Sequence, residues 1–278
     1  TQEYYDTLKQ KFPNKYLSIL WALKDCAIFS FIEDNFEKHP FFHSLIRENS
    51  VERILRKEKY IIDNRKISSC YRFSYEFSPK YAEEPIHIEF SFDINSAFQQ
   101  RVFAIIGENG VGKTQLITAL PLDLAKRREN LFAPQVPLYS KVIAVSTSLY
   151  DSFDVPKNSV GFNYVYCGLA CGKKDNKTIL APKELKLKLL QTIKTINGRE
   201  RAESLKNILS PLYSADIISA LFTIQEEKIK VNQARLVEIV DYMSSGESSL
   251  LFIFCNIVAN IRYDSLILFD EPETHLHP

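Results

Sequence analysis

One octapeptide constrains the fold of this 278-residue chain more than any other feature, because Gly107–Thr114 has the pattern G-x4-G-K-T. It follows an apolar run, 101–106, that we expect to be a strand, and it precedes an expected helix over Gln115–Leu120. Glycines let the backbone wrap a diphosphate closely, while successive N–H groups and the helix N-terminus point at the anion. The pattern therefore predicts a nucleotide-binding phosphate loop. Its candidate ligands are Gly107, Glu108, Asn109, Gly110, Val111, Gly112, Lys113, Thr114 and Gln115.

The chemistry assigns distinct roles to two of these side chains. We expect the Lys113 ammonium to reach the β- and γ-phosphates of ATP and the Thr114 hydroxyl to ligate Mg²⁺. A chance glycine loop is a poor alternative, because the chain has only eight glycines and three of them stand here.

Two adjacent carboxylates follow a second apolar run, Leu266–Phe269. Asp270, at the end of this expected strand, is predicted to hold the Mg²⁺ shell. Glu271 is predicted to polarise the attacking water as a general base. An ordinary acidic turn is the alternative, and the phosphate loop upstream makes it less favoured.

A third motif precedes the apolar run Leu250–Ile261, which is expected to be helical. Small residues and a glycine at a helix start allow two interpretations: an N-cap formed by Ser244 or Ser245, or a second anion-binding nest. The residues of this motif are Ser244, Ser245, Gly246 and Glu247, after Met243.

Hydrophobic periodicity predicts an α/β fold. Apolar residues alternate with polar ones over 71–77 and 86–94, which predicts two antiparallel strands. The unalternating runs 101–106, 142–146 and 265–269 predict a parallel sheet covered on both faces. Helices are expected over 16–36, ended by Pro40, and over most of 172–243, and Pro121 is expected to kink or end the helix of the phosphate loop early.

Composition excludes several classes of protein. The chain is 45% hydrophobic and 25% charged, with a net charge of +1, so no global basic field for nucleic acid exists. A local excess does exist in 172–206, with ten Lys or Arg against four Asp or Glu. Five cysteines without a C-x-x-C pair argue against zinc and disulfides, and no segment resembles a membrane span, so we expect a cytoplasmic protein.

The motifs together resemble the ABC-type ATPase heads of the SMC, RecF and OLD class. The resemblance rests on the phosphate loop (Walker A), SSGE before a helix, and LILFDEPETHLHP at 266–278. It implies a P-loop fold with an antiparallel β lobe, a parallel core sheet and an inserted helical lobe. It also implies a head-to-tail dimer with a second copy, in which Ser244–Glu247 is the signature that caps the partner's ATP. Asp270 and Glu271 would then be Walker B, and Thr274, His275, Leu276 and His277 the D-loop, with His275 near the nucleotide.

A finer resemblance is to the ATPase subunit of Septu-type anti-phage systems, PtuA, including the retron-associated versions. It rests on VIAVSTSLYDSFD (142–154), YVYCGL (164–169) and SSGESS. It implies a weakly hydrolysing ATPase that assembles with an HNH nuclease subunit, and with a reverse transcriptase and its nucleic acid. Alternatives are an OLD-like ATPase-nuclease and a RecF- or SMC-like repair ATPase.

The resemblance also divides the chain into four expected segments. They are a helical segment (1–66), a β lobe with Walker A (67–171), an inserted helical lobe (172–243), and the signature, Walker B and D-loop (244–278). The last of these looks cut short at Pro278.

Overall fold

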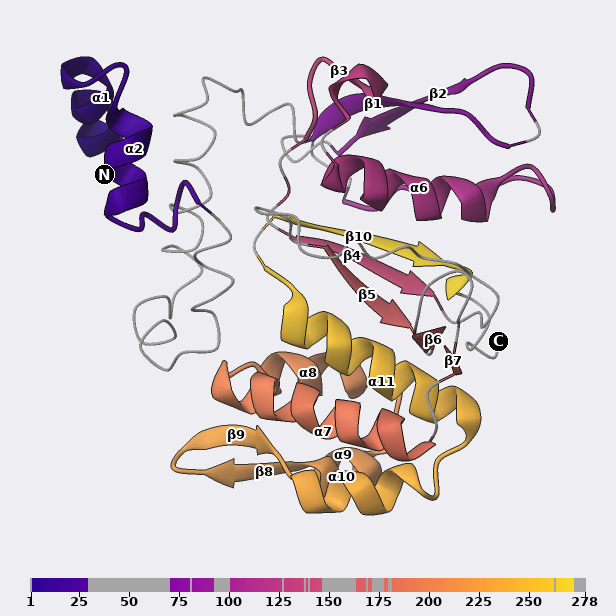
Figure 1. Cartoon of the computed structure of the whole chain (residues 1–278). Helices are drawn as coiled ribbons and strands as arrows, with labels where there is room; N and C mark the ends of the chain where they lie inside the picture. The colour runs from indigo at the N-terminus through magenta and orange to yellow at the C-terminus, as the bar shows by residue number, and fades with distance from the viewer. Residues whose placement is uncertain are drawn as a thin grey trace. The chain divides into compact units, whose positions relative to one another are not determined.

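A computed structural model describes residues 2–29, 71–80, 82–92, 101–126, 128–137, 139, 141–146, 164–168, 170–171, 178–179, 182–262 and 264–272 (Figure 1). The chain divides into two compact units. The first unit comprises Thr1–Val142, Val155–Tyr164 and Arg262–Leu266, and the second comprises Ile143–Asp154, Val165–Ile261 and Ile267–Pro278. No described helix is both long enough and apolar enough to span a bilayer.

The first unit begins with two short helices, α1 (Gln2–Lys11) and α2 (Tyr16–Ala22). They bury Tyr5 and Leu20 against Ala27. The helix predicted over 16–36 is too long, because α2 ends at Ala22. Lys24 adopts a left-handed φ of 55°, and the Asp25 carboxylate accepts the amides of Ala27 (3.0 Å) and Ile28 (3.2 Å). This Asp turn competes with a further helical turn.

The alternating segments form an antiparallel sheet in the first unit, as predicted. Its order is β2 (Ile86–Ser91), β1 (Arg72–Phe77), β3 (Phe132–Ala133). Phe73, Tyr75 and Phe77 are buried on the inner face of β1, while the residues between them are more exposed. Residues 93 and 94 of the predicted second strand lie outside the described part of the chain.

Helix α6 (Lys113–Ala125) begins at the phosphate loop and contains Pro121 in its interior. The prediction that Pro121 ends the helix early is wrong. The turn after it still forms, since Lys126 N–H donates to the Leu122 carbonyl at 2.9 Å. The buried face of α6 stabilises the helix across the missing bond, with Leu116, Ile117, Leu120 and Leu124 in the core.

A buried polar network joins α6 to the sheet. The Tyr75 hydroxyl donates to the Asp123 carboxylate at 2.6 Å, and Arg128 pairs with the other oxygen of that carboxylate at 3.1 Å. Burial, followed by the bond to Asp123, raises the pKa of Tyr75. The partners satisfy a carboxylate that is only 5% exposed.

The strand predicted over 101–106 is absent. These residues have no regular structure, and Val102 and Ile106 are 88% and 92% exposed. An apolar run becomes a buried strand only when a neighbouring strand supplies backbone partners. None of the described strands pairs with this segment.

A parallel sheet has the order β10 (Ser265–Asp270), β4 (Lys141–Ser146), β5 (Tyr164–Gly168), with all three strands running the same way (Figure 1). The predicted runs 142–146 and 265–269 are strands of this sheet, whereas β5 was not predicted. All six residues of β4 are buried. Ile253 and Ile257 of α11 (Ser245–Asn260) pack on this sheet against Ile143, Val145 and Cys167. A separate small pair joins β6 (Ala170–Cys171) to β7 (Thr178–Ile179).

A helical lobe packs on the other side of α11. It contains α7 (Pro182–Gly198), α8 (Ala202–Leu209), α9 (Ala215–Leu221) and α10 (Gln233–Val240). Its core includes Ile193, Leu205, Leu209, Leu236 and Leu251. Arg201 caps the C-terminus of α11 by donating to the carbonyls of Val258 (2.9 Å) and Ile261 (2.6 Å).

The lobe also contains a hairpin that the purely helical prediction missed, β8 (Phe222–Gln225) with β9 (Lys228–Val231). Phe222 and Val231 are buried in the core of the lobe, which favours the strands over a helix. The side-chain amide of Asn197 bonds both backbone groups of Val231, as a neighbouring strand would. It donates to the Val231 carbonyl (3.0 Å) and accepts from the Val231 N–H (2.8 Å).

Candidate nucleotide-binding site

The phosphate loop has the backbone that its glycines predict. Gly110 and Gly112 have φ values of 89° and 99°, which other residues rarely adopt. Gly112 is the N-cap of α6, and its carbonyl accepts the Leu116 N–H at 2.9 Å. A Cβ at Gly107 would lie 3.1 Å from the Val111 side chain. Positions 110 and 112 therefore favour glycine for their backbone conformation, whereas at Gly107 a larger residue would only have to displace the exposed Val111 side chain.

Lys113 points back into the loop that precedes it. Its ammonium donates to the carbonyls of Gly107 (2.7 Å) and Glu108 (2.8 Å). The loop thus curls around a cation at the start of a 13-residue helix, whose first N–H groups are also positive. Both features favour a phosphate group at this place.

The next two side chains, Thr114 and Gln115, differ in their hydrogen bonds. No hydrogen bond of the Thr114 hydroxyl is found among the described residues. Gln115 instead accepts the backbone N–H of Lys80 at 3.0 Å. This bond joins the start of α6 to the segment after β1, so Gln115 has a structural role within the loop region.

The paired carboxylates lie at the C-terminal end of β10, in the second unit. Asp270 is only 5% exposed, whereas Glu271 is exposed and has a left-handed φ of 46°. The turn at Glu271 separates the two carboxylates into a buried one and an accessible one. A buried carboxylate suits a metal shell, and an accessible one suits proton transfer.

Ser244 is the N-cap of α11 and forms a capping box with Glu247. The Ser244 hydroxyl accepts the Glu247 N–H at 3.3 Å, and the Glu247 carboxylate accepts both the N–H and the hydroxyl of Ser244 at 2.8 Å. These bonds to the charged form lower the pKa of Glu247. The N-cap interpretation of this motif is therefore confirmed, and its role as an anion nest stays a prediction.

Gly246 has a different environment from the loop glycines. Its φ lies outside the left-handed region, and a Cβ built on it meets no atom within 4 Å. Neither its backbone conformation nor crowding by the described residues accounts for glycine here, although glycine weakens a helix by about 1 kcal/mol relative to alanine.

Some predicted site residues lie outside the described part of the chain: Thr274, His275, Leu276, His277 and the segment 147–154. Of the basic segment 172–206, residues 178–179 and 182–206 are described. Lys186 pairs with Asp241, and the Lys188 ammonium lies 5.4 Å from the centre of the Phe252 ring. Both cations therefore have partners within the chain. Within the described ranges, no group of three or more His, Cys, Asp or Glu could hold a metal ion.

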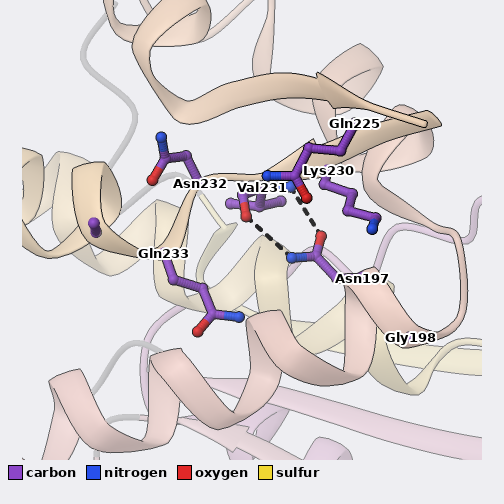
Figure 2. A pocket seen from close by; sticks show the side chains of 8 residues that line it. Asn197, Gly198, Gln225, Lys230, Val231, Asn232 and Gln233 are labelled. Atoms are coloured by element: carbon purple, nitrogen blue, oxygen red, sulfur yellow. Dashed lines mark hydrogen bonds between the residues drawn. The ribbon is translucent and has the colours of Figure 1, made fainter. Parts of the chain in front are cut away.

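An open pocket of about 550 Å³ lies in the helical lobe, where the C-terminus of α7 meets the hairpin and the start of α10 (Figure 2). Gln225, Lys230 and Gln233 line it, and the bonds between Asn197 and Val231 form one wall. The sequence does not point to it, because its residues come from four separate elements without a shared motif.

Comparisons with known proteins give one distant relative. Protein ea59 of Escherichia phage lambda is 24% identical over an alignment of 312 positions. The alignment covers 99% of this chain and 59% of the relative, so the chain spans less than two thirds of that protein. No family model and no solved structure matches the chain.

Proposed function

We propose that the chain is an ATP-binding, weakly hydrolysing ATPase of the ABC type. One observation carries the proposal: the G-x4-G-K-T loop has left-handed glycines at 110 and 112 and encloses the Lys113 ammonium at the start of α6. A loop of this geometry suits the β- and γ-phosphates of a nucleotide, because it combines positive charge with close backbone approach.

The residues have separate tasks in this proposal. Lys113 leaves the carbonyls of Gly107 and Glu108 and binds the phosphates. Thr114 and Asp270 are the motif residues that would hold Mg²⁺, and the ion would supply neutralisation of the phosphate charge. Glu271 is exposed and accepts the proton of the attacking water. These assignments come from the motifs and agree with the burial of each side chain.

We also propose that a second copy completes the nucleotide site. Gly246 supports this part, because the space beside it is open and glycine is not required by its backbone or its neighbours. A phosphate from the partner's nucleotide fits against the N-terminus of α11 at this glycine. Ser244–Glu247 then acts as the signature, as the resemblance implies.

The cellular role that we propose is regulation of a partner HNH nuclease in a cytoplasmic bacterial anti-phage complex. It rests on the resemblance to PtuA, which extends to a reverse transcriptase and nucleic acid as further partners. Co-expression of the chain with such a nuclease tests it. We expect a co-purifying complex whose DNA cleavage depends on ATP, and cleavage that is independent of both ATP and this chain contradicts the role.

The nucleotide proposal is tested by Lys113→Ala with Lys126→Ala as a matched control. Both residues lie at the ends of α6, but Lys126 is exposed at the C-cap. Calorimetric titration with Mg-ATP should show binding to the wild type and to Lys126→Ala. Lys113→Ala should weaken binding on the order of a hundredfold or more, because it removes the charge-assisted contacts to phosphate. Equal affinities in all three proteins contradict the proposal.

A further inference from the structure

Tyr213 connects the turn between α8 and α9 to the first turn of α11. Its ring is buried in the core of the lobe, with 7% of the residue exposed. Its hydroxyl donates to the backbone carbonyl of Glu247 at 2.7 Å. Burial, and then the neighbouring Cys255 and Glu247, raise the pKa of Tyr213, so the phenol keeps its proton and remains a donor.

Three groups of Glu247 form hydrogen bonds: its N–H, its carboxylate and its backbone carbonyl. Its N–H and its carboxylate bond Ser244 through the capping box, and its carbonyl bonds Tyr213. A continuous chain of hydrogen bonds thus runs from Ser244 through Glu247 to Tyr213. The capping box alone determines the shape of the Ser244–Glu247 turn, whereas the Tyr213 bond ties that turn to α8 and α9.

The bond does more than satisfy the Glu247 carbonyl. This carbonyl lies inside the helix, where the N–H of Leu251, four residues on, is its regular partner. A buried tyrosine hydroxyl needs a partner, and here the partner is the backbone of the candidate signature. Phenylalanine would fill the same core volume without making this connection.

We propose that Tyr213 is a positioning residue that holds the signature turn, Ser244–Glu247, in the orientation needed to close on a nucleotide bound by the second copy. This inference rests on the proposed function. It gives the helical lobe a direct hydrogen bond to the signature turn, in addition to the apolar packing of α8 on α11, so a movement of the α8–α9 turn would reach Glu247.

The test compares Tyr213→Phe with Tyr242→Phe. Tyr242 is 91% exposed and lies just before Met243, so its change removes a hydroxyl near the same turn without altering the core. The rate of hydrogen exchange at the amides of residues 248–251 measures how far loss of the hydroxyl loosens the first turns of α11. We expect faster exchange in Tyr213→Phe than in the wild type, and wild-type exchange in Tyr242→Phe.

Steady-state kinetics and Mg-ATP titration then separate positioning from folding. We expect kcat for ATP hydrolysis to fall roughly ten- to a hundredfold in Tyr213→Phe, because a small misplacement of a positioned group is costly. ATP affinity of the single chain should stay within about twofold, because Tyr213 and the phosphate loop belong to different units. The melting temperature should fall by a few degrees at most.

Three results overturn the inference, and they are distinguishable. Unchanged exchange of residues 248–251 shows that the hydroxyl does not hold the turn. Faster exchange with an unchanged kcat shows that the bond is structural alone. If the wild type itself neither binds nor hydrolyses ATP, the proposed function fails and the inference fails with it, whereas an active wild type confines the failure to Tyr213.

Discussion

Glu271 combines an unusual backbone conformation with the chemical role that we propose for it. Its left-handed φ of 46° costs about 1–2 kcal/mol for a side chain with a Cβ. Such strain persists where the surroundings hold it, and it is common at functional sites. At Glu271 the turn places an accessible carboxylate directly after the buried Asp270.

We predict that Glu271→Gln keeps ATP binding and loses hydrolysis. Glutamine has the same size but cannot accept the proton, so turnover should fall on the order of a hundredfold or more. Glu226→Gln is the matched control, because Glu226 is also exposed and has a φ of 51°. Phosphate release and ATP titration measure the two effects. Hydrolysis by Glu271→Gln at the wild-type rate would show that Glu271 is not the general base.

The substitution Gly246→Ala should change stability and ATP-dependent dimerisation in opposite directions. Alanine has room at this position and favours the helix, so Gly246→Ala should raise the unfolding free energy by up to about 1 kcal/mol. The same methyl occupies the space that we assign to the partner's phosphate, so ATP-dependent dimerisation should weaken.

Gly198→Ala is the control for this pair, because Gly198 ends α7 and a Cβ there also meets nothing within 4 Å. It should gain stability without losing dimerisation. Thermal unfolding and ultracentrifugation with ATP measure both properties. If Gly246→Ala dimerises as well as Gly198→Ala does, Gly246 is not at the interface.

At the scale of the element, α11 links the parallel sheet to the helical lobe. One part of it packs on β4 and β5, and another on α7 and α8. Its ends are held by polar contacts, with the capping box at Ser244 and the Arg201 cap at the C-terminus. An apolar helix of this kind needs such caps, because its terminal backbone groups have no partners within the helix.

The capping box predicts a pH dependence. The pKa of Glu247 is below its ordinary value of 4.5 in the folded chain, so the unfolded chain binds this proton more tightly. Its stabilising contribution is therefore complete above that ordinary value and is lost as the pH falls through the lowered pKa. Ser244→Ala should cost about 1 kcal/mol at pH 7.

The difference in melting temperature between the wild type and Ser244→Ala should therefore shrink when the pH is lowered from 7 to 3. Ser245→Ala, which removes an exposed hydroxyl from the same turn, should show a small difference at both pH values. A difference for Ser244→Ala that stays constant with pH would show that the charge of Glu247 does not contribute to the cap.

At the scale of the whole molecule, the proposed composite site predicts complementation between two inactive variants. Lys113→Ala removes the phosphate loop's cation, and Gly246→Arg blocks the signature. A mixed dimer has one site with both lesions and one site with neither. Mixing the two proteins should therefore restore roughly a quarter of the wild-type activity, if mixing is random and the sites act independently.

ATPase assays of the mixture, with each variant alone as control, measure this recovery. The dimer itself is checked by ultracentrifugation of a mixture in which the two variants carry different labels. A verified mixed dimer without activity would argue against a site shared between two copies.

Local sequence patterns determined the elements whose partners lie close in the chain. The alternation in 71–77 and 86–94 predicted β1 and β2, since a period of two places every second side chain on one face. The left-handed glycines of the loop 107–114 and the helix start after it were predictable, because the residues that shape the loop are contiguous in the sequence. The N-cap at Ser244 could also be predicted from the sequence, because its partner Glu247 is three residues away.

Tertiary structure alone decided the features that depend on distant partners. The run 101–106 has the composition of a strand, yet a strand needs backbone partners that composition does not reveal. The hairpin β8–β9 forms because Asn197 and the lobe core satisfy Val231 and bury Phe222. Pro121 stays within α6 because the buried face of the helix outweighs one missing bond. The bond from Tyr213 to Glu247 spans 34 positions. The physical reason is common to all four: local propensity acts over a few residues, whereas burial and long-range hydrogen bonds depend on which segments meet in space.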